Sequence, residues 1–301
     1  MSFINKALEK AKSLHQKKVE VKPPAGQEPP QAPFLDLEEV AGFGETPGEI
    51  QYTYTRKIAV NMDLLRRQRL IVNGSDKTLW EAYKLLRTHV LHRTKREHRN
   101  TLMITGPLPN EGKSLTSINL AISISQKVGQ TVMLVDGDMR NPSLHRYLDL
   151  PSGPGLKDFL TSGYPVADSL VHPEGLTNLV VLPAGSPTSD SAELLSSPRM
   201  LDLVRELKHF YPDRYVLFDL PPLIYADSLA FAPLVDGIIL VVESGKTPRE
   251  EILHAIELLK DFPVLGFVLN KIDTTPLSYG YYPKYYGDQG SQKPSTLPWQ
   301  K

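Results

Sequence analysis

Cysteine is absent from the 301 residues of the chain, which excludes disulfide bonds and thiolate metal sites. The formal net charge is zero, so no overall field favours nucleic acid or anionic lipid as the main partner. Long apolar runs are missing too. The longest, at residues 237–242 and 264–269, have the length of a strand and fall far short of the ~20 residues of a membrane helix. The N-terminus lacks the apolar segment of a signal peptide. We therefore expect a cytoplasmic protein without a nucleic-acid partner.

What is present is the composition of a globular protein, with 41% hydrophobic and 23% charged residues. Residues 1–20 predict a basic amphipathic helix, which either lies on a membrane or partner or packs on its own domain. Residues 21–60, rich in Pro, Gly and Gln, predict a largely disordered linker. The main domain is expected at residues 61–275 and a flexible, tyrosine-rich tail at residues 276–301.

Within the main domain, apolar runs of strand length alternate with amphipathic helical segments. Strands are predicted at residues 101–105, 131–136, 215–219, 237–242 and 265–269, and helices at 114–128 and 249–260. The first helix is expected to turn Val128 towards the core. This alternation indicates an α/β fold whose mostly parallel central sheet is covered by helices on both faces.

The segment between the first strand and the first helix carries a phosphate-binding pattern. Backbone N–H groups of such a loop point at phosphates, while its lysine reaches the β- and γ-phosphates and its hydroxyl ligates Mg²⁺. The pattern begins with a glycine five residues before Gly112. In this chain Pro107 stands at that position, and Gly106 comes just before it. The pattern predicts a three-layer sandwich of the P-loop NTPase class. The expected nucleotide contacts are Pro109, Asn110, Glu111, Gly112, Lys113, Ser114 and Leu115.

Three carboxylates are expected at the carboxyl ends of strands, where parallel sheets bind their ligands. Asp136 and Asp138 follow the second strand, and Asp219 ends the third. Two carboxylates in such positions can divide the work of accepting a proton and holding a metal ion. A single one of them would be read as a solvated turn or a helix cap. Three beside a P-loop favour a phosphoryl-transfer site.

Asn270-Lys271-Ile272-Asp273 has the N-K-x-D spacing by which many GTPases read guanine. The same residues would also suit the end of a strand followed by a turn. Asn270 alone would equally serve as a contact to adenine. The motif therefore leaves ATP and GTP as alternatives.

The motifs together resemble those of the bacterial tyrosine kinases, polysaccharide-associated autokinases related to the Min/Par-type ATPases. The resemblance rests on Gly112-Lys113-Ser114, on Asp136-Gly137-Asp138-Met139-Arg140 and on Phe218-Asp219-Leu220-Pro221-Pro222, in that order. It covers roughly residues 75–275. The N-terminal helix, linker and tail also resemble the subgroup linked to exosortase-type exopolysaccharide loci.

This resemblance implies an ATP- and Mg²⁺-dependent protein-tyrosine autokinase. Lys113 would bind ATP, Arg140 would steady the phosphates, and either Asp136 or Asp138 would act as the base towards a tyrosine hydroxyl. The implied metal ligands are Ser114, Asp136 and Asp219. The implied acceptors, phosphorylated in trans by a neighbouring subunit, are Tyr279, Tyr281, Tyr282, Tyr285 and Tyr286.

The family's E-x-x-R-x-x-R oligomerisation helix is matched by Glu81, Lys84 and Arg87, with lysine replacing the first arginine. The spacing places all three side chains on one helical face, where they would pair across a subunit boundary or simply form an exposed salt-bridge face. Lysine keeps the charge but lacks the bidentate fork of arginine. The resemblance thus implies a homo-oligomer, a ring or a dimer, with a weakened interface.

The family also implies a setting: polysaccharide biosynthesis or export at the inner face of the cell membrane, with a separate membrane co-polymerase (chain-length) protein as activator. An alternative is a Min/Par-type ATPase switch that controls membrane or partner binding without tyrosine phosphorylation. Residues 107–111 contain no lysine, whereas those ATPases usually carry one early in the loop. A degenerate kinase that acts as a scaffold is a third alternative, because of Pro107 and Lys84.

Overall fold

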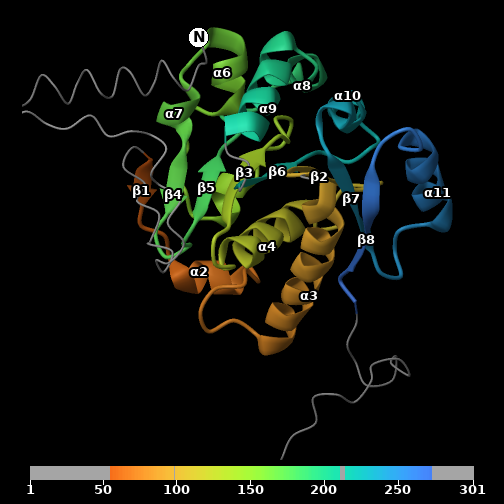
Figure 1. Ribbon diagram of the computed structural model, residues 1–301, viewed down its shortest axis with the longest axis horizontal. Coiled ribbons are helices and arrows are strands. Elements are labelled where there is room, and N and C mark those ends of the chain that lie inside the picture. Colours follow the sequence, from red (N-terminus) through yellow and green to blue (C-terminus); the bar gives the residue numbers. More distant parts are fainter. Residues whose placement is uncertain (1–54, 98, 211–213, 273–301) are drawn as a thin grey trace, which may run out of the picture.

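The computed structural model describes residues 55–97, 99–210 and 214–272 (Figure 1). Their strands form one eight-stranded sheet in the order β1-β4-β5-β3-β6-β2-β7-β8. Six neighbouring strands are parallel: β5 (Leu179–Leu182), β3 (Thr131–Asp136), β6 (Arg214–Asp219), β2 (Thr101–Thr105), β7 (Gly237–Glu243) and β8 (Val264–Asn270). At one edge, β4 (Val171–Pro173) runs antiparallel to β5, and β1 (Arg56–Ile58) pairs with β4. The predicted mostly parallel sheet is confirmed.

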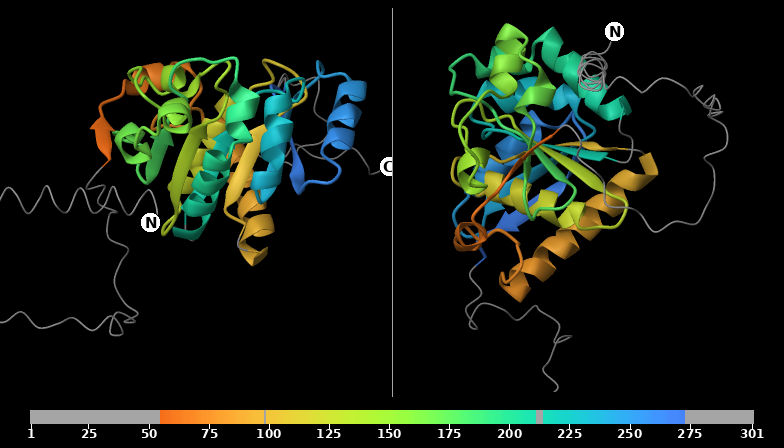
Figure 2. Two further views of the ribbon diagram at one scale, coloured as in Figure 1. Left: turned by 90° about the horizontal axis from the view of Figure 1, so that it is seen from above. Right: turned by 90° about the vertical axis from the view of Figure 1, so that its left-hand side faces the viewer.

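Helices cover both faces of the sheet (Figures 1 and 2). One layer contains α2 (Met62–Arg67), α3 (Lys77–Thr94), α4 (Lys113–Ser125) and α5 (Leu144–Tyr147). The other contains α6 (Leu156–Ser162), α7 (Val166–Ser169), α8 (Ser191–Leu195), α9 (Pro198–Phe210), α10 (Ala226–Phe231) and α11 (Arg249–Leu258). Short 3-10 turns follow α3 (Lys95–Glu97) and α10 (Ala232–Leu234). The predicted three-layer architecture is therefore confirmed.

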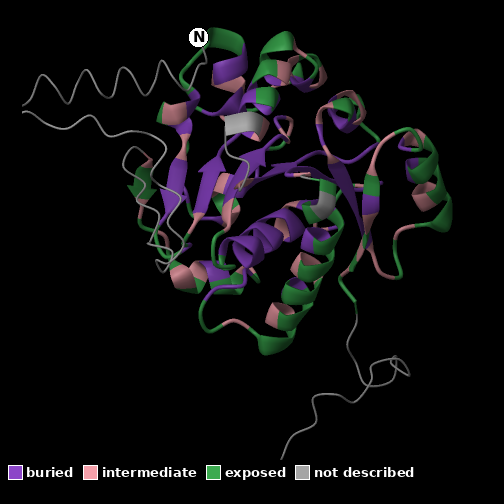
Figure 3. Ribbon diagram, in the orientation of Figure 1, coloured by how far each residue is buried: buried purple, intermediate pink, exposed green. Residues whose placement is uncertain are grey.

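Alternation along the strands separates the two hydrophobic cores. Leu102 and Ile104 of β2 face the core under α3 and α4, and Met103 between them faces the core under α9 and α10. Successive side chains of a strand point to opposite faces, so a continuous apolar run fills both layers. Figure 3 shows the resulting buried sheet between partly exposed helices.

Two features differ from the sequence-based expectation. Strand β1 lies within the stretch 21–60 that predicts a disordered linker, and it escapes notice because it is three residues long and mostly exposed. The expectation for Val128 is wrong, since α4 ends at Ser125 and the Val128 side chain is 76% exposed. Gly129, with φ of 74°, turns the chain there towards β3.

Within the described ranges, no helix has an apolar stretch of the length needed to cross a bilayer. The predicted helix at 1–20, most of the linker, the tail and its five tyrosines lie outside the described residues.

Candidate functional site

The phosphate loop connects β2 to α4, as predicted. Gly112, with φ of 90°, precedes the helix, and Asn110 also has a positive φ of 63°. Both values lie in the left-handed region that glycine and asparagine tolerate best. Lys113 is only 7% exposed, and its ammonium group donates to the backbone oxygen of Leu108 at 2.7 Å. The lysine is therefore folded back across the loop it belongs to.

The glycine that the loop geometry requires is Gly106. A Cβ at this position would lie 2.3 Å from the backbone oxygen of Val241 and 2.5 Å from Oε2 of Glu111. No side chain fits there, because real Cβ atoms do not approach backbone that closely. Pro107 is the next residue, at the position where the pattern has glycine, and it is buried.

The loop is held by a carboxylate of its own, Glu111, and by side chains that follow β7 and lie at the end of β8. The Glu111 carboxylate is buried, and it accepts from the backbone N–H of Leu108 at 2.8 Å and from the Thr247 hydroxyl at 2.6 Å. Asn270 donates its amide to the backbone oxygen of Glu111 at 2.8 Å. The Lys271 ammonium donates to the backbone oxygen of Asn110 at 2.5 Å. We call these four residues, Glu111, Thr247, Asn270 and Lys271, the loop brace.

Asn270 has a structural role in the loop brace that the N-K-x-D motif did not predict. Its amide nitrogen is directed at the P-loop, so close that a Cβ on Gly112 would come within 2.1 Å of it. A contact from Asn270 to a nucleobase stays a prediction, and Asp273 lies outside the described residues. Leu115 is half-buried on α4 and packs against the core, whereas Pro109 and Asn110 are exposed.

Two of the predicted carboxylates meet at the carboxyl edge of the sheet. Asp136 and Asp219 are register partners on β3 and β6, and both are completely buried. Oδ2 of Asp136 accepts the backbone N–H groups of Ser143 and Leu144, each at 3.0 Å. Oδ1 of Asp219 accepts the Ser117 hydroxyl at 2.9 Å. The other oxygen of each carboxylate, Oδ1 of Asp136 and Oδ2 of Asp219, is buried without a hydrogen-bond partner.

Burial dominates the acid–base properties of this site. It raises the pKa of Asp219 to about 7 and the pKa of Asp136 well above its ordinary value, where the neighbouring Asp219 adds to the effect. Burial also raises the pKa of Asp138, which is half-buried and accepts the backbone N–H of Asn141 at 3.0 Å. The pKa of Lys113 is lowered by burial, against the pull of nearby carboxylates. Such a site favours a bound proton or a bound cation.

Ser114, the predicted hydroxyl ligand, is half-buried and shares a 3.0 Å hydrogen bond with the Ser143 hydroxyl. Ser143 thus touches both Ser114 and Asp136. Sequence reasoning missed Ser143, because its contacts form only once β3 and α4 lie side by side. Ser117 could have been found, since it lies one helical turn after Lys113 and so faces the same side of α4.

Arg140 is held by an acidic partner that the sequence did not reveal. Its Nε lies 2.9 and 3.0 Å from the two carboxylate oxygens of Asp227, a fully buried residue of α10. Its guanidinium carbon lies 5.2 Å from the ring centre of Tyr225. Arg140 is therefore fixed to the opposite helix layer, and its contact with phosphate stays a prediction.

The three residues predicted for oligomerisation lie on α3. Lys84 and Glu81 are exposed and form an ion pair of 2.7 Å within the helix. Arg87 is half-buried and donates to the backbone oxygen of Ser123 on α4 at 2.8 Å. Arg87 therefore already has a partner within its own chain.

The comparisons with known proteins agree with this geometry, although no family model matches the chain. The tyrosine-protein kinase YwqD of Bacillus subtilis is 34% identical over 206 residues, which are 67% of this chain and 85% of that protein. The succinoglycan biosynthesis transport protein ExoP of Rhizobium meliloti is 31% identical over 241 residues, 77% of this chain but 29% of that protein.

Among solved structures, the kinase domain of the Escherichia coli tyrosine kinase ETK superposes with a TM-score of 0.61 at 28% identity. The superposition covers 67% of this chain and 80% of that domain. The P-loop sandwich, the strand-end carboxylates and the relatives point to the same conclusion. The chain belongs to the bacterial tyrosine-protein kinases.

Proposed function

We propose that the chain is an ATP-dependent tyrosine autokinase that phosphorylates the tyrosines of its own tail, Tyr279, Tyr281, Tyr282, Tyr285 and Tyr286. The observation that carries this proposal is the pair of buried carboxylates, Asp136 and Asp219, each with one unpartnered oxygen beside the phosphate loop. Unpaired buried oxygens are costly, and a site that keeps them is built for a ligand that completes them.

In the proposed reaction the loop binds the phosphates of ATP through its backbone N–H groups and the start of α4. Lys113 exchanges the backbone oxygen of Leu108 for phosphate oxygens. The tyrosine oxygen bonds to the γ-phosphorus, the bond from that phosphorus to the bridging oxygen breaks, and ADP leaves.

A carboxylate must accept the proton of the tyrosine hydroxyl, whose ordinary pKa is ~10. Asp138 is the best candidate, because it is half-buried and therefore reachable, and burial raises its pKa above the ordinary value. Asp136 is fully buried and held by two backbone N–H groups, which suits a residue that positions and stabilises.

The donor set fits Mg²⁺, with Ser114, Asp136 and Asp219 as the residues that would hold it. The described residues contain no group of three or more His, Cys, Asp or Glu side chains placed to hold a metal ion. Mg²⁺ usually binds through one or two carboxylates and completes its shell with substrate phosphates and water. When bound, it would neutralise charge on the phosphates.

We further propose a role in polysaccharide biosynthesis or export at the inner face of the membrane, together with a membrane co-polymerase that activates the kinase. ExoP supports this, because its name joins biosynthesis and transport and this chain matches only a part of it. Glu81, Lys84 and Arg87 are proposed to contribute to a homo-oligomer. Sedimentation velocity of Lys84→Arg, with the exposed Lys77→Arg as control, tests this, and a distribution unchanged from wild type contradicts it.

Labelled ATP tests the enzymatic proposal. Phosphate should appear on the wild type, should vanish in Lys113→Met, and should be lost when all five tail tyrosines are changed to phenylalanine. Equal labelling of wild type and Lys113→Met would sink the proposal. An excess of unlabelled GTP should not compete, and strong competition would make GTP the donor.

A further inference from the structure

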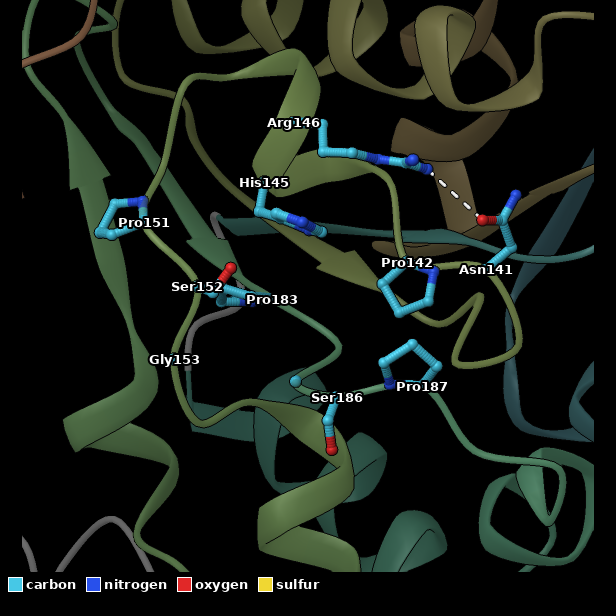
Figure 4. A pocket seen from close by; sticks show the side chains of 11 residues that line it. Asn141, Pro142, His145, Arg146, Pro151, Ser152, Gly153, Pro183, Ser186 and Pro187 are labelled. Carbon is cyan, nitrogen blue, oxygen red and sulfur yellow. Dashed lines mark hydrogen bonds between the residues drawn. The ribbon is translucent and has the colours of Figure 1, made fainter.

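A cavity of about 460 Å³ opens between the segments that follow β3 and β5 (Figure 4). Such a volume is ordinary for a ligand site. Four of its lining residues are prolines, Pro142, Pro151, Pro183 and Pro187, which make its walls apolar and stiff. The remaining lining residues are Asn141, His145, Arg146, Ser152, Gly153, Gly185 and Ser186. We call this cavity the proline pocket.

The proline pocket has a positive side and no carboxylate among its lining residues. Arg146 is exposed, and its guanidinium donates a long 3.4 Å hydrogen bond to Oδ1 of Asn141, drawn as a dashed line in Figure 4. On the other side, Lys157, which is not itself a lining residue, donates from its ammonium to the hydroxyl of the lining residue Ser186 at 2.7 Å. Burial and Arg146 lower the pKa of His145, so the charge belongs to Arg146 and Lys157.

The pocket adjoins the proposed base directly. Asn141 lines the pocket, and its backbone N–H donates to Oδ1 of Asp138 at 3.0 Å. A peptide whose tyrosine hydroxyl reaches Asp138 therefore has its next residues beside the pocket. Apolar walls that lead to a guanidinium suit an aromatic ring that ends in an anion, since arginine binds phosphate with two parallel N–H bonds.

We propose that the proline pocket binds a phosphotyrosine of a second copy's tail and thereby presents an adjacent unmodified tyrosine to Asp138. This inference rests on the proposed autokinase function. The tail suits it, because its five tyrosines lie one to three residues apart. The first phosphotyrosine of a tail would then speed the phosphorylation of the remaining tyrosines of that tail.

The strand order favours a tail from a second copy. The described chain ends at Ile272 after β8, while the pocket lies at β3 and β5, four to five strand spacings or ~19–24 Å away. A tail of the same chain that runs along the carboxyl edge of the sheet would pass the end of β2, and so the phosphate loop. A tail from a second copy can enter without covering that loop.

Direct binding tests the pocket without any need for catalysis. The probe is a synthetic peptide of residues 277–288, either unmodified or phosphorylated on Tyr282, and the protein is the full chain with Tyr→Phe at its five tail positions. Fluorescence anisotropy should show the phosphopeptide binding roughly tenfold more tightly, as a charge-assisted phosphate contact gives. Arg146→Gln should remove this preference. Arg67→Gln, an exposed arginine on α2, should keep it.

A two-copy assay tests the consequence. The five-phenylalanine chain serves as enzyme, Lys113→Met serves as substrate, and intact mass spectrometry counts the phosphates over time. Arg146→Gln in the enzyme copy should leave the first phosphate near its wild-type rate and slow the later ones about tenfold. The same change in the substrate copy should have no effect.

Three results would overturn the inference: equal binding of the two peptides, a preference that survives Arg146→Gln, or later phosphates added at the wild-type rate by the Arg146→Gln enzyme copy. The failure of the autokinase function looks different. In that case no phosphate appears on any substrate copy, while the peptide measurement still reports on the pocket.

Discussion

On the β7–β8 side of the phosphate loop, the polar groups of Glu111, Thr247 and Asn270 are paired with one another or with the backbone of the loop. On the β3–β6 side, Asp136 and Asp219 each keep one oxygen without a partner. The first side needs nothing from outside, whereas the second is incomplete without a proton, a cation or a substrate. The residues that fix the conformation of the loop and the carboxylates available for catalysis thus lie on opposite sides of it.

The largest expected effect belongs to the incomplete side. Asp138→Asn and Asp219→Asn each keep the size of the side chain but remove the charge that takes a proton or holds a cation. We expect the rate of tail phosphorylation to fall at least ~100-fold for each. Labelled ATP provides the measurement, and the exposed Asp168→Asn is the control. Activity within threefold of wild type would show that the incomplete side is not catalytic.

Removal of the Asn270 side chain should weaken the loop brace and with it ATP binding, and should have little effect on phosphoryl transfer. Asn270→Ala deletes the hydrogen bond to Glu111 and opens space beside Gly112, a loss of ~1 kcal/mol that frees the loop to move. The KM for ATP should rise roughly tenfold, with a smaller change in kcat. The ratio of the KM values for ATP and GTP should not change. A shift in that ratio would instead make Asn270 a contact to the base, and the exposed Asn73→Ala is the matched control.

The incomplete side should also make stability depend on pH. The pKa of Asp219 is about 7 in the folded chain against an ordinary 3.8. Between these values the folded chain holds a proton that the unfolded chain has lost, so the free energy of unfolding falls as the pH rises. Asp219→Asn removes the contribution of Asp219 to this dependence, while those of Asp136 and Asp138 remain. Without nucleotide and Mg²⁺, the melting temperature of the variant should exceed that of the wild type by about 3–8 °C at pH 8 and approach it near pH 4. An equal difference at both pH values would contradict this cause.

The smallest effect is expected at the exposed end of the loop brace. The Lys271 side chain is 41% exposed, so its contacts with Asn110 and Glu243 are screened by water. Lys271→Gln should raise the KM for ATP about twofold or threefold. Lys246 binds the same Glu243 but not the loop, so Lys246→Gln should leave the KM unchanged. An equal effect of both variants would show that Glu243 matters and the loop contact does not.

Sequence patterns predicted the central strands of the sheet and missed the short strands at one edge. The strands at residues 101–105 and 131–136 are confirmed residue for residue, since continuous apolar runs between turns have few other uses in a chain of this kind. Strands β1 and β4 have three residues each and depend on pairing, β1 with β4 and β4 also with β5, which no local pattern records.

The candidate site divides in the same way. The positions of Asp136 and Asp219 follow from strand ends, which are local. Thr247, Ser143 and Asp227 contact the site from 136, 29 and 87 residues away in the chain, as their bonds to Glu111, Ser114 and Arg140 show. Spacing in the sequence carries no trace of such partners, because they are chosen by the packing of separate elements.

The displaced glycine of the loop has a consequence for how relatives are found. Gly106 is the residue that the carbonyl of Val241 and the carboxylate of Glu111 leave no room to replace, while Pro107 occupies the place that the familiar signature reserves for glycine. A search that fixes glycine five residues before Gly112 passes over this chain. A search that demands glycine directly after the buried strand, followed by a glutamate just before Gly112, finds it. Such a loop is better identified by the position that lies too close to the neighbouring strand for a side chain than by a glycine at a fixed spacing from Gly112.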